Sequence, residues 1–320
     1  MRKILRSVAA MVLLSGVSVV GAIGQVTPAG ASQRAATATT YTKTVRYGTY
    51  TIPAATETEM GELENRLNLW VSKPCSNCTI TSMKPNLVYT DGTKANVDTG
   101  PMLHHMVLAS QFRSDPTCSG NLLGLVGERF FASGNERTTI EFPSGFGYKV
   151  GWLDQWNLIY DLMNMDMEPK TVYIEMTFKY QTGTGGPEAV RPVWLDIDQC
   201  GDSEYSIPAG TSDTHWDWNV NVPGRIVAIG GHVHSEGHGV RIEATNQTTG
   251  QSICNSVGAY GQAPDYIDMM GEPWLSSMSR CIANPVATVA SGNRVRIHSI
   301  YNSPEPMDDV MGIMIAFIDI

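Results

Sequence analysis

The feature that most constrains the fold is a series of short segments in which apolar and polar residues alternate. Examples run from Tyr47 to Ile52, from Leu103 to Ser110, from Thr171 to Tyr180 and from Arg294 to Tyr301. A period of two places alternate side chains on one face of a strand, and clusters of Gly, Pro, Asn and Asp separate the segments. Many short strands at this spacing are typical of a sandwich or jelly roll, so the sequence predicts an all-β fold.

A change in composition near the middle of the chain predicts a domain boundary. The acidic segment Asp196 to Asp198, with Asp202, leads into Ile207 to Gly210, and a new set of strands follows. The chain is long enough for two domains of ordinary size. We therefore expect an N-terminal domain over residues 46–200 and a C-terminal domain over residues 201–320.

The first residues have the order of a targeting segment. A basic stretch, an apolar stretch and a small-residue cleavage pattern follow one another: Arg2, Lys3 and Arg6; Ala9 to Ile23; Ala29 to Ala31. This order predicts a cleaved signal peptide over residues 1–31 and a secreted protein. The Ala- and Thr-rich residues 32–45 are interpreted as a flexible leader.

The charge balance limits the partners. The formal net charge is −9, and it becomes more negative when a signal peptide with three cations is removed. An acidic protein is repelled by nucleic acid and by anionic lipid, so we expect neither nucleic acid nor, after signal cleavage, a membrane as partner.

Six cysteines in an exported chain predict disulfides. Their spacing suggests a bond between Cys254 and Cys281, and it leaves the pairing of Cys75, Cys78, Cys118 and Cys200 open. A zinc site on Cys75 and Cys78 is the weaker alternative, because no second CxxC motif and no histidine at finger-like spacing accompany the pair.

The strongest constellation for metal binding is the His-X-His motif at His232 and His234, which glycines precede and follow. In a strand, residues i and i+2 share a face, so both imidazoles can bind one ion. His238, four residues further on, is a candidate supporting residue or alternative ligand. Two surface histidines on a loop are the alternative interpretation.

A second constellation is the adjacent pair His104 and His105 inside an apolar strand. Ideal strand geometry sends the two rings to opposite faces, so shared ligation requires a bulge or a strand end. A structural, hydrogen-bonded histidine is the competing interpretation for this pair. Methionines form a third constellation near the C-terminus, where Met311 or Met314 offers a soft thioether suited to Cu(I), or simply packs in the core.

The ordered set of motifs resembles a known family. A His-His-Met segment, a glycine-preceded His-X-His and a C-terminal Asp-X-Met-Gly-like segment are similar to those of the copper type II, ascorbate-dependent monooxygenases. That family includes peptidylglycine α-hydroxylating monooxygenase and dopamine β-monooxygenase. The resemblance covers roughly Pro85 to Ile320 and implies two tandem antiparallel jelly-roll domains with one copper in each.

The resemblance also implies which residues bind copper. His232, His234 and Met311 match the ligands of the copper that activates O2, and His104 and His105 match two of three histidines at the electron-transfer copper. Where the family has the third histidine this chain has none, so the first site is expected to be impaired. The replacements considered are Met163 and, less well, Lys179. The peptide-amidating members carry an arginine two residues before the His-X-His, and Gly230 stands there, which disfavours peptide amidation.

Two functions follow from these observations. The first is a secreted copper monooxygenase that uses O2 and ascorbate or another reductant to hydroxylate a small organic substrate. The alternative is a non-catalytic extracellular protein that binds or sequesters copper.

Overall fold

The computed structural model describes residues 38–118 and 127–320, and these residues are mostly strands. In chain order the described strands are β1 (Thr39–Ile52), β2 (Gly61–Val71), β3 (Cys78–Tyr89), β4 (Pro101–Ser110), β5 (Glu128–Ser133), β6 (Ile140–Glu141), β7 (Phe146–Val150), β8 (Trp156–Asn164), β9 (Lys170–Thr182), β10 (Glu188–Asp196), β11 (Glu204–Ile207), β12 (Gly210–Asn219), β13 (Gly224–Val233), β14 (Gly239–Asn246), β15 (Gln251–Tyr260), β16 (Leu275–Met278), β17 (Arg280–Val289), β18 (Arg294–Ser303) and β19 (Met307–Asp319). Two short 3-10 helices accompany them, η1 (Val97–Thr99) and η3 (Pro264–Tyr266). The prediction of an all-β fold is confirmed.

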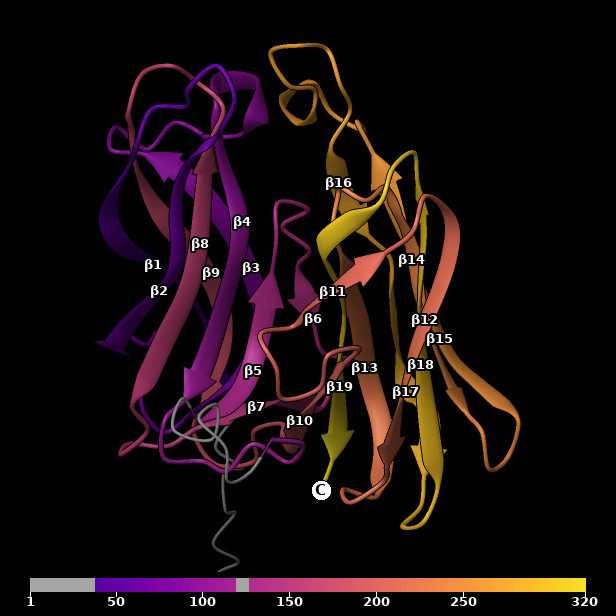
Figure 1. The fold of residues 1–320 in the computed structure, drawn as a ribbon. Coiled ribbons are helices and arrows are strands. Elements are labelled where there is room, and N and C mark those ends of the chain that lie inside the picture. The colour runs from indigo at the N-terminus through magenta and orange to yellow at the C-terminus, as the bar shows by residue number, and fades with distance from the viewer. Residues whose placement is uncertain (1–37, 119–126) are drawn as a thin grey trace, which may run out of the picture. The chain divides into compact units, whose positions relative to one another are not determined.

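The described strands form three sheets (Figure 1). A ten-stranded sheet has the order β1-β9-β3-β7-β10-β19-β13-β17, with β11 added to β19 and β6 added to β3. A five-stranded sheet has the order β12-β18-β14-β15-β16, and a four-stranded sheet the order β2-β8-β4-β5. Neighbouring strands are antiparallel except for β10 and β7, which pair in parallel. The long sheet therefore links the early and the late strands of the chain.

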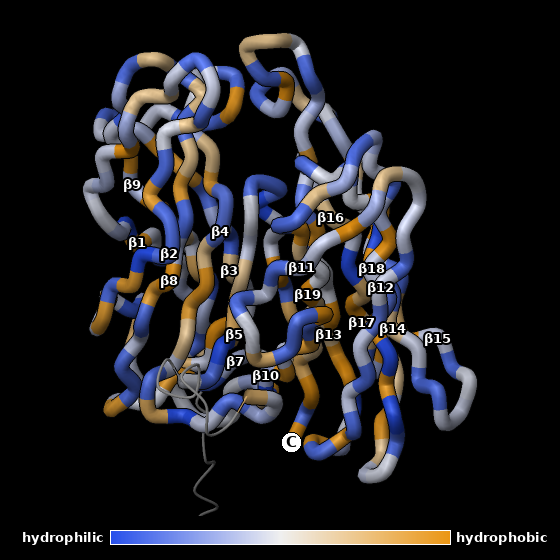
Figure 2. Tube along the Cα trace, in the orientation of Figure 1, coloured by the Kyte–Doolittle hydropathy of each residue, from blue (hydrophilic) through white to orange (hydrophobic). Residues whose placement is uncertain are grey.

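Strand β19 separates two hydrophobic cores. Met311, Ile313, Ile315 and Phe317 belong to the first core, whereas the alternate residues from Val310 to Ile318 pack in the second. A strand that is buried on both faces needs an almost continuous run of apolar residues, and Figure 2 shows β13 and β19 as largely hydrophobic in the middle of the fold. This arrangement decides which methionine of β19 faces which core.

The structure tests only some of the predictions made for the N-terminal region. The predicted signal peptide lies outside the described residues. The flexible leader predicted to extend to residue 45 is wrong in its last part, because β1 begins at Thr39 and pairs with β9 from Thr39 to Ile52. Within residues 38–118 and 127–320, no helix has the length and apolar character needed to span a membrane.

The predicted boundary at residue 200 falls between strands of one sheet. β10, on its N-terminal side, pairs with β19 from Val190–Asp319 to Asp196–Ile313, and β11, on its C-terminal side, also pairs with β19. The described residues form one compact unit. The division into two domains therefore stays a prediction.

All six cysteines are in disulfides. The bond predicted between Cys254 and Cys281 is present, and the other two join Cys118 to Cys200 and Cys75 to Cys78. The alternative of a zinc site on Cys75 and Cys78 is thereby wrong.

Candidate metal centre

A β-bulge in β4 brings the rings of the adjacent histidine pair to one place. β4 and β8 are in register at Leu103–Leu162 and again at His105–Asp161, so His104 is an extra residue in β4. An extra residue interrupts the strict alternation of faces, and the ring centroids of His104 and His105 lie only 3.9 Å apart. The bulge that shared ligation requires is therefore present.

The His-X-His motif lies at the end of β13 and needs no bulge. Val233, the last residue of β13, is fully buried in the second core. Because alternate residues point to opposite faces, His232 and His234 share the other face, with ring centroids 5.4 Å apart. The backbone N–H of His234 donates to the Tyr301 hydroxyl at 2.7 Å, which fixes the position of the chain at that histidine.

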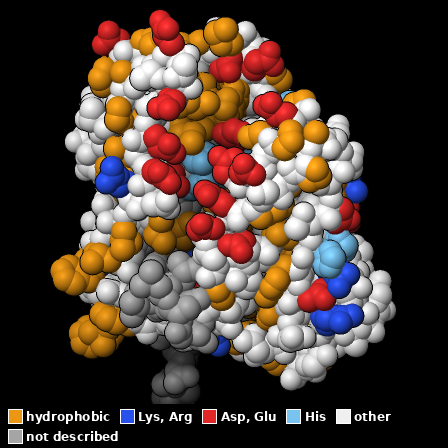
Figure 3. All heavy atoms as spheres, in the orientation of Figure 1, with side chains coloured by type: hydrophobic (Ala, Val, Ile, Leu, Met, Phe, Trp, Pro, Cys, Tyr) orange, Lys and Arg blue, Asp and Glu red, His pale blue; other side chains and the backbone are white. Residues whose placement is uncertain are grey.

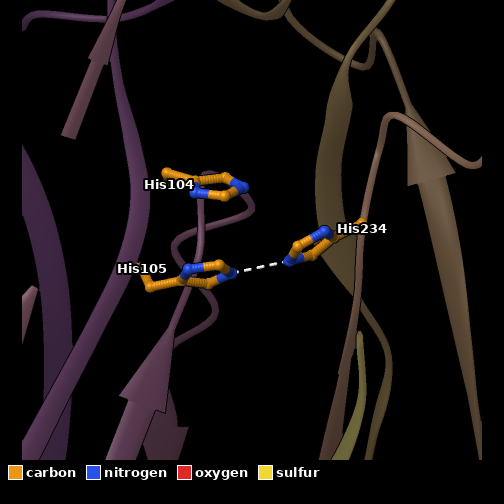
Figure 4. A group of neighbouring side chains, drawn as sticks. All are labelled: His104, His105 and His234. Atoms are coloured by element: carbon orange, nitrogen blue, oxygen red, sulfur yellow. Dashed lines mark hydrogen bonds between the residues drawn. The ribbon is translucent and has the colours of Figure 1, made fainter. Parts of the chain in front are cut away.

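The two motifs meet in one group, which we call the histidine cluster: His104, His105, His232 and His234. Nε2 of His105 lies 2.6 Å from Nε2 of His234, the contact drawn in Figure 4. One ring nitrogen from each of His104, His105 and His234 lies within 4.8 Å of the others, close enough for a shared metal ion. The ring of His232 is 5.5 Å from that of His105, centroid to centroid.

This geometry differs from the two separate sites that the sequence predicts. The sequence analysis divides the histidines into a first site with His104 and His105 and a second with His232 and His234. In the structure the facing sheets bring the rings of both motifs into contact, and His234 supplies the third imidazole that the first motif lacks within its own half of the chain.

Two buried carboxylates orient one ring from each motif. Oδ2 of Asp161 lies 3.2 Å from Nδ1 of His105, and Oε1 of Glu136 lies 3.2 Å from Nδ1 of His232. When Nδ1–H donates to a carboxylate, the lone pair of Nε2 is free to bind a metal ion, and such pairs commonly support metal-bound histidines.

Gly134 leaves space for the ring of His232 and the carboxylate of Glu136. Its backbone N–H donates to Oε1 of Glu136 at 3.0 Å. A Cβ at this position would lie 2.5 Å from Cε1 of His232 and 2.8 Å from Oε2 of Glu136. Any larger residue would therefore displace the ring or the carboxylate.

Three imidazoles of the cluster, those of His104, His105 and His234, have lowered pKa values. Burial lowers the pKa of His104 to about 4, although the carboxylate of Asp161 raises it in part. Burial, with the neighbouring histidines as a further cause, also lowers the pKa of His105 and that of His234 well below the usual value. Burial raises the pKa of the Glu136 carboxyl, but His232 and the hydrogen bonds outweigh this effect and lower the pKa overall. Neutral imidazole is the form that binds metal ions.

Two nitrogens of the cluster have no hydrogen-bond partner in the described part of the chain. They are Nδ1 of His104 and Nε2 of His232, and both are buried. A buried polar atom without a partner costs about 1–3 kcal/mol, and a metal ion or a ligand is one way to satisfy it. Both residues line a small space together with the buried Glu136 and the partly buried Glu236.

Met311 is the methionine that faces the cluster. It lines a cavity together with His105 and His232, whereas Met314 is fully buried in the second core. Imidazole nitrogen with thioether sulfur is a donor set suited to copper. The choice between the two methionines, which the sequence left open, is thus decided by their opposite faces on β19.

The other candidate residues do not belong to the histidine cluster. Met163 pairs with Met102 and Glu62 across the four-stranded sheet, on the same face of β8 as Asp161. Lys179 forms an ion pair with Glu141 at the surface. The remaining histidines have other partners: His215 and His298 face one another across β12 and β18, and His238 packs on Tyr260.

The sequence analysis missed Asp161 and Glu136. Asp161 could have been found from the sequence, because it is a charged residue among the apolar residues of β8. Glu136 could not, because it lies in the turn after β5 and meets His232 only through the fold.

Comparisons with known proteins identify the family of this chain. Residues 146–319 match the family "Stress up-regulated Nod 19". A "Probable copper-dependent oxygenase M1" from Phoma sp. is 31% identical over 291 residues, covering 86% of this chain and 71% of the relative. A "Probable copper-dependent oxygenase clz3" from Cochliobolus lunatus is 30% identical over 260 residues, covering 74% and 78%. The chain belongs to the Stress up-regulated Nod 19 family and is a homologue of these two fungal proteins.

Two solved structures, both viral proteins, match this chain at low identity. The STIV MCP is 10% identical with a TM-score of 0.34, covering 88% of this chain and 97% of its own. A chain of the Sulfolobus Turreted Icosahedral Virus is 11% identical with a TM-score of 0.35, covering 87% and 90%. Similarity at this level supports no conclusion about function.

Proposed function

We propose that this protein is a secreted copper-dependent oxygenase whose copper is held by His104, His105 and His234. The observation that carries the proposal is the meeting of three neutral imidazole nitrogens within 4.8 Å of one another. The names of the two fungal homologues point to the same metal and reaction class. His232 and Met311 are the nearest further donors, so the donor set combines imidazole with thioether, as copper prefers.

The donor atoms fit copper better than the hard cations. Ca2+ and Mg2+ prefer carboxylate, carbonyl and water oxygens, whereas the atoms that converge here are imidazole nitrogens. The unpartnered Nε2 of His232 and Nδ1 of His104 also suit a nitrogen-preferring ion.

Copper bound there would supply the one-electron chemistry that lets O2 react with a C–H bond, with electrons from ascorbate or another reductant. Hydroxylating one C–H bond with O2 consumes two electrons and two protons and releases one water molecule. Asp161 and Glu136 would hold His105 and His232 in one tautomer and orientation throughout. The cavity beside these two histidines would hold the organic substrate and exclude water from it.

The proposal keeps the relationship to the copper type II, ascorbate-dependent monooxygenases and the division into two jelly-roll domains. The two hydrophobic cores on either side of β19 support that division. The single cluster differs from the arrangement implied by the resemblance, in which each domain has its own copper.

The test is copper reconstitution followed by measurement of ascorbate-dependent O2 uptake. We expect uptake in the copper-loaded protein and none in the metal-free protein or in a His105→Ala variant. Tight copper binding without any O2 uptake across a range of reductants would support the alternative, a protein that only binds copper.

A further inference from the structure

A large cavity adjoins the histidine cluster. It has a volume of about 490 Å3, and His105, His232 and Met311 line it. Much of the remaining wall is apolar, formed by residues such as Val107 and Ile159. Val107 and His105 are two residues apart on β4, as Ile159 and Asp161 are on β8, so one sheet face supplies both the wall and the site.

One arginine in this wall has a free donor. Arg129 is 4% exposed, and its Nε donates to Oδ2 of Asp115 at 2.8 Å. The guanidinium carbon lies 4.4 Å from the ring centroid of Trp194, which also lines the cavity. Nη2 of Arg129 is buried and has no hydrogen-bond partner among the described residues.

These contacts make Arg129 a rigid donor. The ion pair and the stacking on Trp194 hold the planar guanidinium in one orientation, so little side-chain entropy remains to be lost when a ligand binds. An unsatisfied buried N–H costs about 1–3 kcal/mol. A ligand in the cavity that offers an acceptor oxygen would remove that cost.

The charges around the cavity exclude an anionic ligand. Asp115 already neutralises Arg129, and Asp161, Asp202 and Glu204 line the same cavity. Figure 3 shows acidic side chains gathered around a hollow in which histidine is visible.

We propose that Nη2 of Arg129 binds the carbonyl or hydroxyl oxygen of an uncharged, mainly apolar molecule held in this cavity. The identification of this molecule as the substrate rests on the proposed function. Its binding in the cavity does not depend on that function. Arg129 is then a specificity-determining residue: it selects an acceptor oxygen, and the acidic surroundings reject a carboxylate.

The experiment measures binding to the metal-free protein, so that it can succeed or fail independently of copper chemistry. Three probes of similar size are compared by calorimetry: 2-acetylnaphthalene, 2-ethylnaphthalene and 2-naphthoate. A hydrogen bond from the charged guanidinium predicts that the ketone binds at least roughly tenfold more tightly than the hydrocarbon. The carboxylate should bind most weakly.

The Arg129→Lys variant retains a charge for Asp115 but loses the second nitrogen of the planar fork. It should bind the hydrocarbon as before and lose the preference for the ketone. Arg113→Lys is the matched control, because Arg113 pairs with Asp154 outside this cavity. Val107→Trp, which fills the cavity, should weaken binding of the ketone and of the hydrocarbon alike.

Several results would overturn the proposal. They are equal binding of ketone and hydrocarbon, tightest binding of the carboxylate, no binding of any probe, or a ketone preference that a folded Arg129→Lys variant retains. If that variant does not fold, two measurements still test the proposal: the ranking of the three probes on the native protein and the effect of Val107→Trp.

Discussion

The two histidine motifs bring their rings together by different backbone routes. In the His-X-His motif, regular alternation is sufficient, because Val233 enters the second core and its two neighbours share the other face. The adjacent pair requires the bulge at His104. A spacing of two residues thus predicts by itself that two histidine rings share one face of a strand. For adjacent histidines, a shared face can be predicted only when the register with the neighbouring strand is known.

The two motifs are alike in the carboxylates that hold their rings. Each has one ring held by a buried carboxylate, His105 by Asp161 and His232 by Glu136. Each also has a ring without such a partner, His104 and His234. The comparison suggests that both motifs contribute to one centre on similar terms, and the following predictions test that equality.

The largest effect is expected from removing one imidazole of either motif. His105→Ala and His234→Ala should each weaken copper binding by more than about a hundredfold, because each removes a nitrogen that points at the shared position. Competition with a chelator of known affinity measures this. His298→Ala, at the surface, is the control. A large loss in one variant with no loss in the other would show that the motifs serve different sites.

A smaller effect is expected from the carboxylates. Asp161→Asn and Glu136→Gln keep the size of the side chain and remove its charge, so each should weaken copper binding by about ten- to a hundredfold. The same competition assay measures it. Glu141→Gln, which alters only a surface ion pair, should leave affinity unchanged. An unchanged copper affinity in both Asp161→Asn and Glu136→Gln would show that these carboxylates do not support the copper ligands.

Protonation should destabilise the metal-free protein. The folded-state pKa of His104 is lowered to about 4, and an unfolded histidine titrates near 6.5. The unfolded state therefore binds more protons between these values, and stability falls as the pH drops from about 6.5 to 4. We expect a loss of roughly 2 kcal/mol or more in the free energy of unfolding, measured by urea denaturation. His104→Gln should make this dependence shallower; an equal slope in both proteins would contradict the assignment.

The smallest effect is expected from the thioether. Met311→Leu should lower Cu(I) affinity by about three- to tenfold and leave Cu(II) affinity almost unchanged, since sulfur favours the reduced ion. Met314→Leu, on the opposite face of β19, is the matched control. Equal effects of the two substitutions on Cu(I) binding would mean that Met311 acts through packing alone.

Much of the fold follows from local pattern. The alternating segments, the bond between Cys254 and Cys281 and the continuous apolar run of β19 are all visible in the sequence, because each depends on neighbours along the chain. The site was predictable only in its parts. The bulge at His104 depends on the register with β8, and the contact of Glu136 with His232 joins residues 96 positions apart.

The number of copper ions per chain tests the central claim most directly. Titration of the metal-free protein with copper, followed by removal of loosely held metal and elemental analysis, counts the tightly bound ions. One shared centre predicts one tightly bound copper per chain, and none in either His105→Ala or His234→Ala. Two equally tight coppers, one of which survives each substitution, would contradict a shared centre and restore two separate sites.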